Sequence, residues 1–221
     1  ALPEEARTEL ANPSFESAEA RILIVRLSPW KDVDRSSAHL LLFSETRAAL
    51  PGAFIDFAFL PERQDREVLQ DREILRDREG QTLPWFYGIA SGRSPADFDL
   101  VLVSNAFGLE LVNLGALLTS SGLPTRASAR KGREDLPILI LGGSNAAACG
   151  PLFDEADDSL VDGLFVGEGE GAVGVLAACL TAPGLARKER LEAAAAKVPG
   201  FHPALHPASP PMKARILREA P

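Results

Sequence analysis

Cysteine is scarce in this sequence: Cys149 and Cys179 are the only two in 221 residues. They lie 30 positions apart, a spacing that fits neither a disulfide framework nor a metal site built from close ligand pairs. Small apolar residues surround each one, so we expect two buried, unreactive thiols. Such sparing use of cysteine is typical of a protein in the reducing cytoplasm.

Clustered positive charge and membrane-length apolar runs are also missing. The 31 acidic residues outnumber the 23 basic ones, giving a formal net charge of -8, and no Lys/Arg cluster is long enough to follow a phosphate backbone. We therefore expect no nucleic-acid partner. No apolar segment has the length needed to span a bilayer, and residues 1–20 are too acidic and polar for a signal peptide. We expect a cytoplasmic protein without a membrane partner.

Apolar, β-branched segments alternate with helical patterns along the chain. The predicted strands are 21–27, 53–61, 99–105, 137–143 and 161–167. The predicted helices are 36–50, 109–124, 172–180 and 186–197. This alternation favours an α/β fold, a doubly wound parallel sheet of five strands covered on both faces. At 46% hydrophobic content, a chain of this length is expected to form one such domain.

Four further segments flank or interrupt the predicted α/β core. Residues 1–20 form an N-terminal leader, and residues 65–79, where Asp-Arg-Glu recurs three times, predict an exposed helix with ion pairs. The aromatic-rich stretch 82–98 is expected to pack over one rim of the sheet. Residues 186–221 predict a helix and then a proline-rich linker. The folded domain is therefore expected to span residues 21–185.

Four predicted loops follow strands and are expected to meet at one edge of the sheet, where parallel α/β folds bind ligands. These loops are 28–34, 104–108, 142–150 and 167–174. They supply the candidate ligand-binding residues Ser104, Asn105, Gly142, Gly143, Ser144, Gly167, Glu168, Gly169 and Glu170. Hydroxyls, amides and carboxylates beside bare glycine backbone suit a large, amide-rich and largely uncharged ligand.

The last of these loops also matches a dinucleotide-binding pattern. Gly169, Gly171 and Gly174 have the G-x-G-x-x-G spacing. That fingerprint normally follows the first strand of a βαβ unit, whereas here it follows the fifth predicted strand. Glu168 and Glu170 would also place negative charge beside a pyrophosphate, which opposes the helix N-terminus. Glycines that only allow close approach to a neighbouring loop remain the alternative.

Two longer stretches carry a family resemblance. They are FDLVLVSNAFGLELVNLGALLTSSGLP and LPILILGGSNAAACGPLFDEADDSLVDGLFVGEGEGAV. Together they resemble the cobalamin-binding domain that precedes the catalytic barrel in many radical S-adenosylmethionine (radical SAM) proteins, over residues 20–185. The tail VPGFHPALHP, followed by MKARILRE, is similar to the join that leads into the radical core in one branch of these proteins.

This resemblance implies a flavodoxin-like (Rossmann-like) sheet, with the corrin ring over the carboxyl ends of the strands and its nucleotide tail between the sheet and a helix. By position, Ser104 and Asn105 would face the corrin or its tail. Gly142 and Gly143 would let the tail pass. The loop from Glu168 to Glu170 would contact the far edge of the ligand.

Two motifs of the resembled proteins are absent. The first loop of the cobalamin domain carries Asp-x-His-x-x-Gly, whose histidine replaces the lower axial base, but here Asp32 is followed by Asp34. His39 falls inside the predicted helix and is expected to be an ordinary helix residue. The lower face of a bound corrin would then be open, water-bound or covered by another group. The cluster motif Cys-x-x-x-Cys-x-x-Cys is missing too, so this chain by itself would be non-catalytic.

The leading hypothesis is a cobalamin-binding-like N-terminal module of a radical SAM enzyme, with methyl transfer as its candidate reaction. Its partners would be its own downstream radical SAM core, which would hold S-adenosylmethionine and a [4Fe-4S] cluster, and a small-molecule substrate. A cofactor-free scaffold domain of the same fold is the first alternative. A dinucleotide-binding oxidoreductase is the second.

Overall fold

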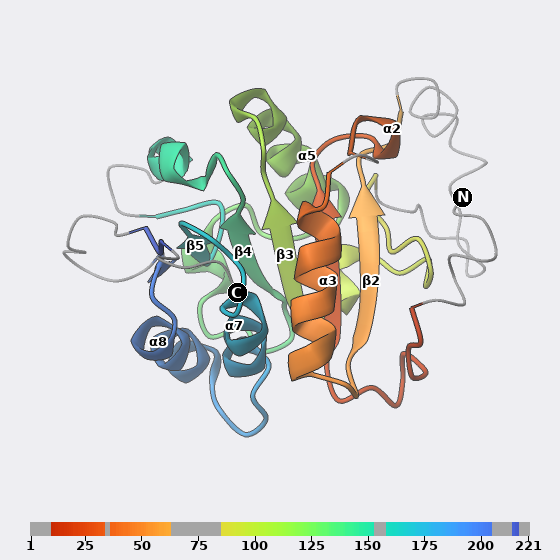
Figure 1. The fold of residues 1–221 in the computed structure, drawn as a ribbon, viewed down its shortest axis with the longest axis vertical. Coiled ribbons are helices and arrows are strands. Elements are labelled where there is room, and N and C mark those ends of the chain that lie inside the picture. The colour runs from red at the N-terminus through yellow and green to blue at the C-terminus, as the bar shows by residue number, and fades with distance from the viewer. Residues whose placement is uncertain (1–9, 34–35, 63–84, 153–157, 205–213, 217–221) are drawn as a thin grey trace.

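The computed structural model describes residues 10–33, 36–62, 85–152, 158–204 and 214–216. Its centre is one sheet with the strand order β2-β1-β3-β4-β5-β6 (Figure 1). The strands are β1 (Arg21–Arg26), β2 (Phe54–Phe59), β3 (Leu100–Ser104), β4 (Ile138–Gly142), β5 (Gly163–Phe165) and β6 (Phe201–Pro203). The first five pair in parallel, and β6 runs antiparallel to β5.

Helices cover both faces of the sheet, as the alternating sequence pattern predicts. On one face lie α3 (Ala38–Ala49), α7 (Val173–Leu180) and α8 (Arg187–Lys197), in front of the strands in Figure 1. The opposite face packs against α5 (Val112–Ser120). Successive strand residues enter opposite cores: Ile24 packs under α3 and α7, whereas Val25 packs under α5. The predicted flavodoxin-like α/β fold is confirmed.

Shorter helices connect these elements. They are α2 (Trp30–Val33), α6 (Ala127–Arg130), and the 3-10 helices η1 (Pro95–Asp97), η2 (Gly108–Leu111) and η3 (Ala146–Leu152). The described part of the aromatic segment, residues 85–98, packs against the edge strand β2, where Ile89 N–H donates to Phe57 O at 2.9 Å and Phe86 is fully buried. The helix predicted over residues 65–79 lies outside the described residues.

The strand count needs correction from five to six, because residues 201–203 form β6 rather than part of a linker. Two glycines make this pairing possible. Gly200 turns the chain with φ +88°, and a side chain on it would meet Val166 O at 2.5 Å. Gly163 leaves room for the Phe201 ring, which a Cβ at position 163 would approach to 2.5 Å. Neither contact is visible in a local hydropathy pattern.

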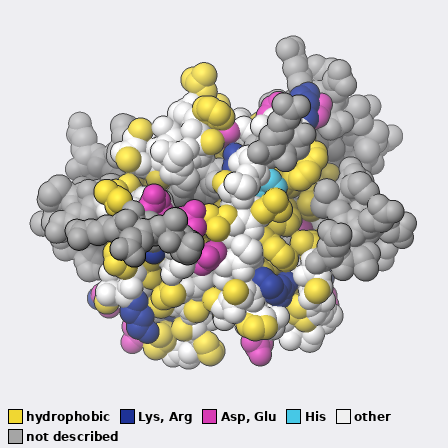
Figure 2. Space-filling model, in the orientation of Figure 1, with side chains coloured by type: hydrophobic (Ala, Val, Ile, Leu, Met, Phe, Trp, Pro, Cys, Tyr) yellow, Lys and Arg dark blue, Asp and Glu magenta, His cyan; other side chains and the backbone are white. Residues whose placement is uncertain are grey.

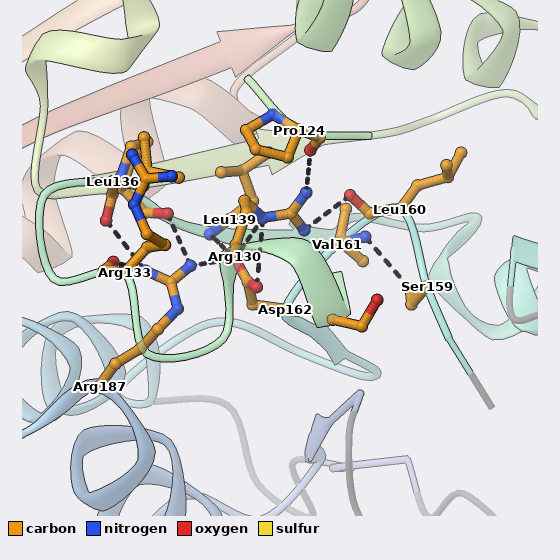
Figure 3. A network of polar contacts seen from close by, with 12 residues as sticks. Pro124, Arg130, Arg133, Leu136, Leu139, Ser159, Leu160, Val161, Asp162 and Arg187 are labelled. Atoms are coloured by element: carbon orange, nitrogen blue, oxygen red, sulfur yellow. Dashed lines mark hydrogen bonds and ion pairs between the residues drawn. The ribbon is translucent and has the colours of Figure 1, made fainter. Parts of the chain in front are cut away.

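Helix α8 is tied to the amino ends of the strands by a buried charge network (Figure 3). The Asp162 carboxylate, just before β5, accepts hydrogen bonds from Arg187 Nη2 at 2.7 Å and from Leu139 N–H at 2.7 Å. Arg130 Nε lies 3.3 Å from the same carboxylate. All three charged side chains are at most 5% exposed. The network lies at the opposite end of the strands from the predicted ligand-binding loops.

Candidate functional site

A cavity of about 490 Å³ opens at the carboxyl ends of β3, β4 and β5. Helices α3 and α7 wall it on one side, with Leu41 and Leu42 from α3 and Val173 and Leu176 from α7. Every candidate ligand-binding residue named from the sequence lines this cavity, except Asn105. The structure therefore brings three of the four predicted loops together around one space.

The cavity exists because side chains become smaller along one row of the sheet. Phe59, Arg26, Ser104 and Gly142 are neighbours in register across β2, β1, β3 and β4. Residues in register on parallel strands project from the same face, which here is the face under α3 and α7. A large ring is thus followed by a guanidinium, a hydroxymethyl group and no side chain. Because the side chains of Ser104 and Gly142 are small or absent, the space above these two residues stays open.

Asn105 organises the rim from inside the protein rather than lining the cavity. Its side chain is fully buried. Nδ2 donates to Phe107 O at 2.8 Å and to Glu110 Oε2 at 3.0 Å, while Oδ1 accepts from Asn145 Nδ2 at 2.8 Å. Asn105 therefore fastens the loop after β3 to the loop after β4, and its polar groups are used within the chain.

Two of the candidate glycines are required by close approach within the chain. Gly143 has φ +105°, and a Cβ there would lie 2.2 Å from Asn105 O. Gly167 has φ +117°, and a Cβ there would lie 2.2 Å from Arg215 O. Gly142 differs, because a Cβ on it would make an ordinary contact, 3.6 Å from Phe165 O. Of the three, Gly142 is the one whose missing side chain opens the cavity.

A segment far along the chain completes the wall beside the Gly167–Glu170 loop. Arg215 N–H donates to Val166 O at 2.9 Å, and Glu168 N–H donates to Arg215 O at 3.1 Å. Arg215 Nη1 also donates to Glu168 O at 2.6 Å, and Ala214 lines the cavity. Sequence reasoning placed residues 214–216 in a linker, and no local pattern marks them as part of a site.

The G-x-G-x-x-G glycines serve helix packing in this structure. A Cβ on Gly174 would meet Glu45 O at 2.6 Å and Ala49 Cβ at 2.9 Å, so this glycine lets α7 lie against α3. Gly171 N–H donates to Glu45 Oε2 at 2.9 Å. After β5 and α7 come α8 and the antiparallel strand β6, instead of the parallel strand of a βαβ unit. The topology thus agrees with the argument against a dinucleotide site that was drawn from the place of these glycines after the fifth predicted strand.

Comparison with known proteins identifies the family. The model described as "Radical SAM proteins, N-terminal" matches residues 48–202, more than half of the chain. The chain belongs to this family. No curated protein and no solved structure matches. The match runs from the end of α3 into β6.

Sequence reasoning missed one charged residue of the radical SAM N-terminal domain beside the cavity, Arg26. It ends β1, is 2% exposed, and places Nη1 3.4 Å from the Ser104 hydroxyl. Burial lowers the pKa of Arg26, while the charge of Glu110 acts in the opposite direction. The sequence feature that could have indicated it is an arginine at the end of the apolar run RILIVR, on the same side of the strand as Ile22 and Ile24.

His39 is confirmed as a helix residue and does not line the cavity. Its ring is 2% exposed and makes edge contacts with Trp30, Phe57 and Phe59. Burial, and next the charge of Arg26, lower its pKa, so the imidazole is held neutral. Its aromatic surroundings are those of a packed side chain.

The two cysteines of the radical SAM N-terminal domain are free and buried, as expected. Burial raises the pKa of the Cys149 thiol, whose Sγ lies 3.3 Å from Asn145 O. In the described residues no group of three or more His, Cys, Asp or Glu side chains is placed to hold a metal ion. Among the same residues, no helix has the length and apolarity needed to cross a membrane.

Proposed function

We propose that this radical SAM N-terminal domain is a cobalamin-binding module. The main observation behind this proposal is the cavity of about 490 Å³ at the carboxyl ends of the parallel strands. Its size lies within the range of small-molecule and cofactor sites, about 300–1,000 Å³. Apolar side chains from α3, α7 and the sheet line its interior, and glycine-rich loops form its rim.

The residues present fit such a ligand in two parts. The apolar space between α3, α7 and the row containing Ser104 and Gly142 suits the flat aromatic base of the nucleotide tail. Outside it, the backbone and carboxylates of the Glu168–Glu170 loop suit amide N–H groups at the corrin edge. Figure 2 shows acidic side chains gathered beside hydrophobic ones on this face. When bound, cobalamin would supply a cobalt centre able to carry a methyl group.

The lower axial position is the main departure from the resembled domains. In the described part of the first loop, Trp30–Val33 forms α2, and His39 is packed among aromatic rings. The proposal therefore includes no histidine ligand from this loop. This departure is the observation that favours the second candidate, a scaffold domain of the same fold without a cofactor.

The proposal extends to the whole protein. S-adenosylmethionine and the [4Fe-4S] cluster would be held by a downstream radical SAM core, which with a small-molecule substrate would be the partner of this cytoplasmic module. The cavity would face the chemistry carried out there, and methyl transfer is the candidate reaction. These statements rest on the family assignment together with the cavity.

Retention of hydroxocobalamin tests the cofactor directly. The purified chain is incubated with hydroxocobalamin and passed over a gel-filtration column, and the corrin absorbance of the protein peak is measured. We expect a red protein. Gly142→Leu fills the cavity, because its side chain would enter the space above β4, and is expected to lose the colour.

The matched control is Gly115→Leu, in α5 on the other face, where a Cβ meets nothing within 4 Å. It is expected to keep the colour. A colourless wild-type protein would favour the scaffold domain instead. A thermal shift with NAD or FAD but not with hydroxocobalamin would favour the dinucleotide-binding oxidoreductase.

A further inference from the structure

Arg26 occupies an unusual position for an arginine. It is 2% exposed, yet its hydrogen-bond partners among the described residues are hydroxyls, Ser36 Oγ at 3.2 Å and Ser104 Oγ at 3.4 Å. Its Nε has no hydrogen-bond partner in the part of the chain that the structure describes. A buried guanidinium stays charged, and burying it without a carboxylate or phosphate partner is costly. Such a group is expected to meet an anion in the functional state.

The nearby carboxylate of Glu110 is already engaged by other donors. It accepts hydrogen bonds from the Ser28 hydroxyl, from Asn105 Nδ2, and from the backbone N–H groups of Ala106 and Phe107. Three of these donors bind Oε2, and the Ser28 hydroxyl binds Oε1. Glu110 therefore organises the loop after β3 and acts on Arg26 at a longer range, as its effect on the pKa of Arg26 shows.

Arg26 does not itself line the cavity, but its hydrogen-bond partner Ser104 does. Ala38, the first residue of α3, lines the cavity as well. The N-cap residue Ser37 makes no side-chain capping hydrogen bond. The positive end of the α3 dipole and the Arg26 charge thus lie at the same corner of the cavity. Glu168 and Glu170 lie at the rim formed by the loop after β5.

We propose that Arg26, Ser104 and the N-terminal end of α3 form a subsite for a phosphate group of the ligand that enters this cavity. The inference rests on the proposed function, since cobalamin carries one phosphodiester in its nucleotide tail. Guanidinium and hydroxyl donors are suited to phosphate oxygens, and the ion pair forms where water is largely excluded. The carboxylates at the opposite rim then set the orientation, because they repel the same phosphate.

The experiment compares two corrins that differ in this group. Cyanocobalamin has the nucleotide phosphate, and dicyanocobinamide lacks both the phosphate and the base. Affinities are measured by absorbance titration for the wild-type chain, Arg26→Met and Arg26→Lys. Arg26→Met is expected to weaken cyanocobalamin binding about tenfold or more and to leave dicyanocobinamide binding unchanged. Arg26→Lys, which keeps the charge, is expected to recover part of the difference.

Thermal unfolding of the ligand-free variants separates binding from folding. Replacing a buried charge without an anionic partner by an apolar side chain of similar length is expected to keep or raise the Tm. Arg47→Met is the contrasting control, because Arg47 donates hydrogen bonds to Pro51 O, Ala53 O and Asn12 Oδ1. It is expected to lower the Tm and to leave the preference for cyanocobalamin intact.

The remaining outcomes separate the phosphate subsite from the cobalamin proposal. Equal cyanocobalamin affinity in wild type and Arg26→Met would overturn the phosphate subsite while leaving the cobalamin proposal in place. If no corrin binds but inorganic phosphate raises the Tm of wild type and not of Arg26→Met, the subsite stands and the cobalamin proposal fails. If neither corrins nor phosphate distinguish the two proteins, the subsite is refuted.

Discussion

At the residue scale, the site is shaped by side chains that never reach the cavity. The side chain of Asn105 holds two loops together by hydrogen bonds, and the absence of a side chain on Gly143 lets the Asn105 backbone approach. His39, a residue of α3, is packed among aromatic rings. A polar residue at the end of a strand is therefore a fair guide to where a ligand site lies, but not to which atoms face the ligand, because burial and partners decide that.

His39 should make the stability of the domain depend on pH. Burial, together with the Arg26 charge, lowers its folded-state pKa below the ordinary value of 6.5. The unfolded chain then binds more protons below about pH 6.5, so the free energy of unfolding falls as the pH drops from there through the folded pKa. Urea unfolding of wild type and His39→Leu at about pH 7.5 and 5.5 measures this.

The wild type is expected to lose more stability than His39→Leu over this interval. Other groups titrate equally in both proteins, so the difference between them isolates position 39. Parallel losses in the two proteins would contradict a neutral, buried imidazole at this position.

At the element scale, α8 is held by a buried charge network as well as by apolar contacts. Arg187 at its first turn donates to Pro137 O at 2.8 Å and to the Asp162 carboxylate, while Leu191, Ala194 and Ala195 pack against the apolar core. The helix pattern of residues 186–197 is local and was predicted correctly. Its attachment was not, because Arg187 and Asp162 are 25 positions apart and meet through folding.

Removing the Asp162 carboxylate should destabilise the domain strongly. Asp162→Ala leaves Arg130 and Arg187 buried without their shared anion, a change that costs about 3–5 kcal/mol in buried pairs. The midpoint of urea unfolding is the measurement. Asp135→Ala is the matched control, because its pair with Arg133 at 2.6 Å is solvent-exposed. A control variant as unstable as Asp162→Ala would refute this account.

At the scale of the whole molecule, β6 closes one edge of the sheet. It covers β5, a strand of three residues, and its Phe201 ring packs against Gly163. The segment 214–216 then lies beside the carboxyl end of β5 and walls the cavity. The end of the sheet and the wall of the site are thus built by residues that follow the last predicted strand.

Truncation should reveal the role of β6. A chain cut after Lys197 lacks β6 and exposes the edge of β5, and exposed edges promote pairing between chains. It is expected to self-associate in light scattering and to melt at a lower temperature than a chain cut after Ala204, which keeps β6. Equal mass and equal Tm for the two truncations would show that β6 contributes nothing to the fold.

The sequence by itself determined the α/β alternation, the five parallel strands and the edge at which the glycine-rich loops meet. These follow from local periodicity and from the geometry common to parallel sheets. Only the tertiary structure decided the sixth strand, the inward use of Asn105, the wall provided by Arg215 and the place of Arg26 beside Ser104. Each of these depends on contacts between residues far apart along the chain, where register and close packing, rather than local pattern, set the distances.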